Sequence, residues 1–119
     1  MGKFLDENGV SKLMTKMKGV VTQKASGTTS LTAAAGQYYD IAGTVNTLTV
    51  TLPAVTATTH METIILHFTT GTTPNVTLTA SEGKTISYFA DYAIEASTEY
   101  EINIIWNGTK WVVAFATIE

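Results

Sequence analysis

The chain has no cysteine, no arginine and only two prolines in 119 residues, and only 14% of its residues are charged. Without cysteine there is no disulfide framework, no thiolate nucleophile and no cysteine zinc site. Without arginine, and with a net charge of -3, the chain is not expected to bind nucleic acid. No run is apolar enough to span a bilayer and the first residues lack the apolar core of a secretory signal, so neither membrane insertion nor export is expected.

Threonine is the residue in excess, at about one residue in five. Its branched side chain suits a β-strand, where the hydroxyl can face water while the methyl group packs on neighbours. Hydrophobic residues make up 45% of the chain, which is enough for one core in a single domain of this length. The composition therefore predicts a mainly β protein with threonine-covered sheet faces.

The first two dozen residues follow a helical period instead. Apolar residues recur at i, i+3, i+4, i+7, i+10 and i+11, namely Val10, Leu13, Met14, Met17, Val20 and Val21. The spacing predicts an amphipathic helix within residues 1–24, with Asp6 as its N-cap. So short a helix is marginal alone in water, so its apolar face must be buried either on the β domain or on other copies of the helix.

Four residues of this stripe occupy the a and d positions of a short heptad pattern. We expect them to form an interface between copies of the chain: Val10, Leu13, Met17 and Val20.

The charges are divided unevenly along the chain. In residues 1–24, five lysines against two acidic residues give +3, whereas in residues 25–119 two lysines against eight acidic residues give -6. Two interpretations fit: the lysines form the solvated face of the helix, or the segment is a basic docking arm on an acidic body.

After a small-residue linker at 25–28, residues 25–119 are expected to form the β domain. Alternating apolar and polar residues separated by turn signals predict strands over 30–33, 37–41, 47–52, 62–69, 75–79, 85–88, 99–106 and 110–118. Short strands at this spacing favour an antiparallel β-sandwich, jelly-roll-like in order, behind the N-terminal amphipathic helix.

The last two strands can be aligned through their turn. A two-residue Asn107-Gly108 turn pairs Trp106 with Thr109 and Ile104 with Trp111. The large residues then share one face, which we take as the core, so both tryptophans are expected to be buried. The opposite faces carry more apolar residues than solvent alone explains, which indicates burial by a neighbouring subunit: Ile65, Ile105, Val112, Ala114 and Ala116.

No catalytic constellation stands out. His60 and Glu62 share a face if both lie in a strand, but His67 points to the other face, so no metal site is expected. No hydroxyl is framed by a nucleophile motif, and no phosphate-binding glycine pattern occurs. The chain is therefore expected to be non-enzymatic and without a cofactor.

Aromatic residues gather near loops in the segment 87–92. Tyr88 and Tyr92 with Asp91 combine rings with a carboxylate, as in sugar-binding surfaces, where rings stack on the apolar faces of the sugar. The alternative is that these rings cap one end of the sandwich. If a ligand site exists, we expect it at Tyr88, Asp91 and Tyr92.

Two stretches carry a family resemblance. The opening KFLDENGV of residues 3–10 with the KMK of 16–18 resembles the N-terminus of tail, fibre and baseplate-associated proteins of bacteriophages, and residues 68–78 and 99–108 are similar to closing strands of their small β domains. The resemblance implies a non-enzymatic virion protein, made in the bacterial cytoplasm, that forms a homotrimeric fibre or appendage. Its N-terminal helix would join other virion proteins and its β domain would face outward, as a receptor-binding tip, a head fibre or a capsid decoration. If the aromatic segment binds a ligand, a host-surface glycan is the one expected. A capsid decoration protein and a monomeric bacterial carbohydrate-binding module are the alternatives.

Overall fold

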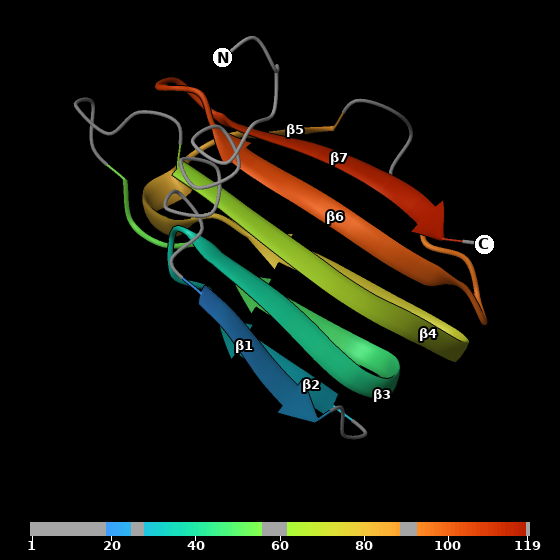
Figure 1. Ribbon diagram of the computed structural model, residues 1–119. Helices are drawn as coiled ribbons and strands as arrows, with labels where there is room; N and C mark the ends of the chain where they lie inside the picture. Colours follow the sequence, from blue (N-terminus) through green and yellow to red (C-terminus); the bar gives the residue numbers. More distant parts are fainter. Residues whose placement is uncertain (1–18, 25–27, 56–61, 89–92, 119) are drawn as a thin grey trace, which may run out of the picture.

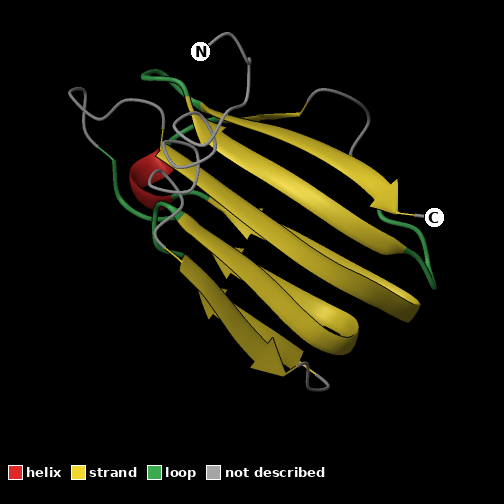
Figure 2. Ribbon diagram, viewed as in Figure 1, coloured by secondary structure: helices red, strands yellow, loops and turns green. Residues whose placement is uncertain are grey.

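The computed structural model describes residues 19–24, 28–55, 62–88 and 93–118, and these are mainly β (Figure 1). Only one short helical turn, η1 (Ser81–Gly83), interrupts the strands (Figure 2). The strands are β1 (Gly19–Lys24), β2 (Thr28–Thr32), β3 (Gln37–Thr51), β4 (Glu62–Thr79), β5 (Ile86–Tyr88), β6 (Glu99–Trp106) and β7 (Trp111–Ile118). No helix in these ranges is long and apolar enough to cross a membrane.

All the described strands belong to one sheet, in the order β1-β3-β4-β6-β7-β5, with β2 also paired to β3. The mainly β prediction is confirmed. The antiparallel, jelly-roll-like arrangement is not: β1 and β2 run parallel to β3, β3 to β4 and β5 to β7, and only the β4/β6 and β6/β7 pairs are antiparallel. Half-buried strands alternate in the same way in both arrangements, so the alternation could not distinguish them.

The long strands β3 and β4 bend so that each contributes to two layers. The register between them shifts around 40–47, next to Gly43, whose φ of 89° suits glycine alone. Beyond the bends, Thr47–Thr51 pairs with Asn75–Thr79 and with β2. Positions expected to be turns between separate strands are therefore bends within continuous strands.

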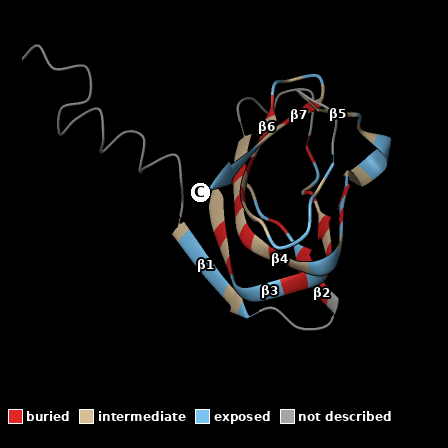
Figure 3. Cartoon of the chain, turned by 90° about the vertical axis from the view of Figure 1, so that its right-hand side faces the viewer, coloured by how far each residue is buried: buried red, intermediate tan, exposed pale blue. Residues whose placement is uncertain are grey.

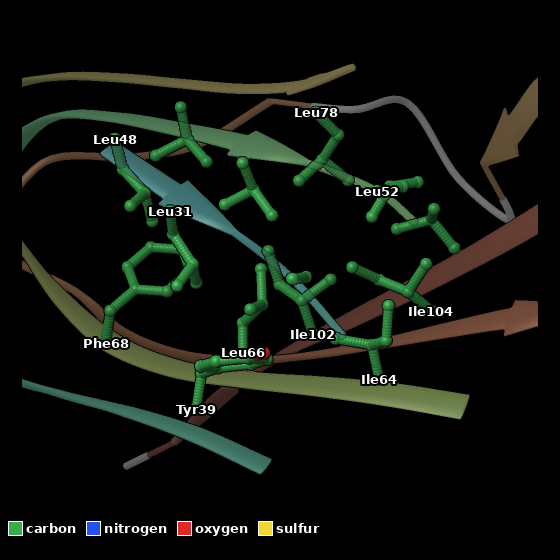
Figure 4. Close-up of a cluster of buried hydrophobic side chains, with 14 of the residues drawn as sticks. Leu31, Tyr39, Leu48, Leu52, Ile64, Leu66, Phe68, Leu78, Ile102 and Ile104 are labelled. Carbon is green, nitrogen blue, oxygen red and sulfur yellow. The ribbon is translucent and has the colours of Figure 1, made fainter. Parts of the chain in front are cut away.

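The core lies between these two layers. Figure 4 shows side chains of the first layer, such as Leu66 and Phe68, pointing toward Leu31 and Leu48 of the second. Burial of this kind is the main stabilising contribution, about 1.5–3 kcal/mol for each large apolar side chain. In Figure 3 the buried residues are on the strands that surround this interior, while β1 lies at its margin and has no buried residue.

The last hairpin confirms the predicted faces but not the predicted pairing. Trp106 lies opposite Trp111, and both rings are buried, with centroids 5.6 Å apart. The loop has four residues because Asn107 accepts hydrogen bonds from the backbone N–H groups of Thr109 and Lys110, both at 2.9 Å. The slip of two residues keeps every side chain on its predicted face, because a strand repeats every two residues.

The end of the predicted helix is a strand. Val20 and Val21 lie in β1, which pairs with β3 over its whole length, so the helix does not extend over them. The sheet partner overrides the weak helical preference of these two β-branched residues. Three other residues of the predicted contact, Val10, Leu13 and Met17, lie outside the described residues.

Candidate functional site

The side of the first layer that faces away from the core, here called the outer face, carries the unusual polar groups of the molecule. Adjacent strands place their side chains in rows across it: Val20 beside Tyr38, Ile65, Asn103 and Ala114, and Thr22 beside Asp40, His67, Glu101 and Ala116. Thr63, Ile105 and Val112 form a further row, and Thr69, Glu99 and Ile118 lie at the opposite end. The outer face therefore combines apolar rows with one strongly polar row.

His67 on β4 lies at the centre of the polar row, between two carboxylates from different strands. Its Nδ1 is 2.8 Å from Oδ1 of Asp40 on β3, and its Nε2 is 2.5 Å from Oε2 of Glu99 on β6. The parallel β3/β4 register places Asp40 directly opposite His67. The antiparallel β4/β6 register pairs His67 with Glu101, so Glu99 reaches the ring from a diagonal position, opposite Thr69. The network thus connects three neighbouring strands across their outer face.

This geometry favours a charged imidazole. A neutral ring has one N–H, so one of the two short contacts would set a nitrogen lone pair against a carboxylate. With both nitrogens protonated, each N–H donates to a carboxylate. The hydrogen bonds to Asp40 and then to Glu99 raise the pKa of His67 above its ordinary value of 6.5.

A second contact extends the network. The hydroxyl of Tyr38 donates a hydrogen bond of 3.2 Å to Oε2 of Glu101. Burial of Tyr38 and the neighbouring charge of Glu101 raise the pKa of the phenol, so Tyr38 stays neutral at physiological pH. Three carboxylates against one imidazolium leave this part of the outer face negatively charged.

Both nitrogens of His67 are engaged by carboxylates, so the ring neither activates a hydroxyl nor coordinates a metal in this state. Across the described ranges, no group of three or more histidine and acidic side chains is arranged to hold a metal ion. Of the residues weighed as metal ligands, Glu62 and His67 lie on opposite sides of β4, as predicted, and His60 is outside the described residues.

The predicted ligand residues are placed only in part. Tyr88 lies in β5, opposite Val113, and is half-buried against the core. Burial raises the pKa of its hydroxyl. Asp91 and Tyr92 lie outside the described residues, so their position relative to Tyr88 stays a prediction.

The predicted interface residue Val20 is the most exposed large apolar residue described, at 68%, followed by Ile118 at 41% and Val21 at 38%. The apolar residues expected on the outer sides of the strands do share the outer face. Ile65, Ile105, Val112 and Ala114 are half-buried, and Ala116 is exposed.

Sequence reasoning missed the Asp40–His67–Glu99 network. Its members are separated by 27 and 32 residues along the chain, and no local motif connects them. The pairings of β3 with β4 and of β4 with β6 would have revealed it.

Compared with protein-family models, with curated proteins and with solved structures, the chain matches none of them.

Proposed function

We propose that the chain is a non-enzymatic structural protein of a bacteriophage virion, a homotrimeric fibre or appendage that displays its β domain outward. The proposal rests first on the resemblance of residues 3–10, 68–78 and 99–108 to such proteins. A described outer face without a nucleophile–base pair is consistent with a structural role.

The observation that carries the proposal is the exposure of Val20. It ends the apolar stripe that begins at Val10, and it is 68% exposed on β1, the edge strand of the sheet. Its in-sheet neighbour Tyr38 belongs to the outer face, so the stripe continues into that face. An exposed apolar residue beside a sheet face with apolar rows favours burial between copies of the chain.

The mass of the full chain in solution, measured by light scattering, tests the proposal. We expect a trimer, and we expect Val20→Lys to shift the protein toward monomer because it places a charge in the contact. Thr32→Lys is the matched control, since it adds the same charge at another exposed strand residue, on β2 in the second layer. A wild-type monomer at micromolar concentration would overturn the homotrimer and favour the monomeric carbohydrate-binding module.

A glycan on the host surface is the ligand we propose for the displayed domain, at Tyr88, Asp91 and Tyr92. One such site is weak, but three per trimer raise the apparent affinity through effective concentration. Replacing Tyr88 and Tyr92 with alanine should abolish adsorption of particles to cells, whereas phenylalanine at both positions, which keeps the rings, should preserve it. Adsorption that survives the alanine pair would leave these rings as a structural cap.

A further inference from the structure

The outer face is an open surface that carries both apolar and acidic side chains. Among the described residues, no strand lies over it in Figure 1. Its rows place half-buried apolar side chains, Ile65, Ile105 and Val112, beside the carboxylates of Glu99 and Glu101. A surface of this kind suits an amphipathic partner that is apolar on one side and basic at its flanks.

The charge of the outer face excludes one occupant. Two such faces packed on each other would bring Asp40, Glu99 and Glu101 of each copy together, with only one imidazolium each to offset them. Like charges placed opposite each other oppose association. The occupant must therefore be cationic.

The chain itself supplies a cationic amphipathic segment. Residues 1–18 hold four of the seven lysines, and they end directly before β1, at the edge of this same face. At about 100° per residue, Lys16 and Lys18 flank the stripe of Val10, Leu13 and Met17 on either side. Nine residues of helix are about 13 Å long, which spans about three strands spaced about 4.8 Å apart.

We propose that residues 10–18 of a neighbouring copy bind the outer face. The apolar stripe lies on the rows of Ile65, Ile105 and Val112, and Lys16 and Lys18 pair with Glu99 and Glu101. The inference rests on the proposed homotrimer and specifies its contact: each copy gives its segment to the next, which closes a ring of three.

Chain geometry favours the neighbouring copy over the same chain. Residue 18 is bonded to Gly19, which lies in the plane of the sheet. A helix with side chains is about 10 Å wide, so its axis stands about 10 Å above the sheet, and three extended residues are needed to cover that distance. Docking on its own chain would unwind residues 16–18 and remove Met17 and both flanking lysines from the contact.

Charge reversal tests the inference. Glu101→Lys should raise the concentration at half-assembly about tenfold, which for a trimer is about a hundredfold in the dissociation constant, or about 2.7 kcal/mol per trimer. Glu82→Lys makes the same change in net charge on the exposed turn η1, away from the outer face, and should leave assembly unchanged. Lys16→Glu combined with Lys18→Glu should also weaken assembly, and adding Glu101→Lys to the same chain should restore it, which separates lost pairing from misfolding.

Cross-linking identifies which copy supplies the segment. Full-length chains carrying light and heavy nitrogen isotopes are mixed, and lysine–carboxylate pairs are joined by a carbodiimide. We expect peptides that join Lys16 or Lys18 of one isotope to Glu99 or Glu101 of the other.

The outcomes separate this inference from the proposed function. A wild-type monomer overturns both. A trimer in which Glu101→Lys behaves like Glu82→Lys, or in which cross-links to Glu99 and Glu101 join one isotope only, overturns the inference and leaves the homotrimer standing.

Discussion

At the scale of single residues, His67 is the group whose charged form the structure favours. Its side chain is 25% exposed and donates to two carboxylates from different strands. In the unfolded chain these partners are absent, so its pKa returns to about 6.5. Folding therefore favours the protonated ring.

The sign of the pH dependence follows from the raised pKa of His67. The stabilisation is fully present below pH 6.5 and is lost as the pH rises through the folded value. We expect His67→Gln to lower the free energy of unfolding by about 0.5–1 kcal/mol near pH 6 and by less near pH 9, as measured by urea unfolding. In an NMR titration Asp40→Asn should lower the pKa of His67, whereas a wild-type value at or below 6.5 would contradict the network.

Thr70 is a buried polar residue whose hydroxyl makes hydrogen bonds to the backbone of the turn at residues 95–98. Its Oγ1 donates to the carbonyl of Glu95 at 2.7 Å and accepts from the N–H of Thr98 at 2.9 Å. Thr70→Val has the same shape but leaves both groups without this partner, so it should lower the free energy of unfolding by about 1–3 kcal/mol. Thr70→Ser keeps the hydroxyl and should cost less in the same thermal or urea unfolding, and an equal loss for both would mean that the methyl group matters instead.

Some residue-level features could be predicted from the sequence and others could not. The burial of Trp106 and Trp111 was predicted because alternation is local and survives an error of two residues in pairing. Asp40 and Glu99 were not linked to His67, because that contact depends on which strands are neighbours. Val20 was predicted as an interface residue and is exposed, but it lies on a strand.

At the scale of elements, the bends of β3 and β4 decide the architecture. The sequence pattern predicts two strands in place of each of them, because Gly43 and the segment 70–74 are typical of turns. A period of two identifies the buried face of each half, yet it does not show that both halves belong to one strand or that β3 and β4 run parallel. Those properties depend on long-range pairing.

The bends also predict a coupled pair of positions. A Cβ added at Gly71 would lie 2.3 Å from Oδ1 of Asn46 on the neighbouring bend. Asn46 is exposed, so its side chain can turn away, and Gly71→Ala should cost about 0.5–1.5 kcal/mol in urea unfolding. In an Asn46→Ala background this cost should disappear, whereas additive effects of the two changes would show that the clash is not its source.

At the scale of the whole molecule, β1 joins the sheet to the segment proposed to hold the copies together. Its six residues pair with Gln37–Ala42 of β3, so β1 belongs to the sheet. Two of these residues, Val20 and Val21, are also the last members of the apolar stripe in the sequence. Both faces of β1 are partly open, since Val20 and Val21 point to opposite sides and both are exposed, and its far edge pairs with no other described strand. Changes in β1 are therefore expected to affect both the assembly of copies and the stability of the domain.

Two truncations separate these roles. Removing residues 1–18 takes away the stripe residues Val10, Leu13 and Met17 but leaves β1, so the protein should keep its β-type circular dichroism and cooperative melting while its mass falls to that of a monomer. Removing residues 1–24 also strips β1 and uncovers the edge of β3, which should lower the melting temperature and promote aggregation. Light scattering and thermal melts of both proteins measure the difference. A trimer that persists without residues 1–18 would place the contact between the β domains, and equal melting temperatures would show that β1 adds no stability to the sheet.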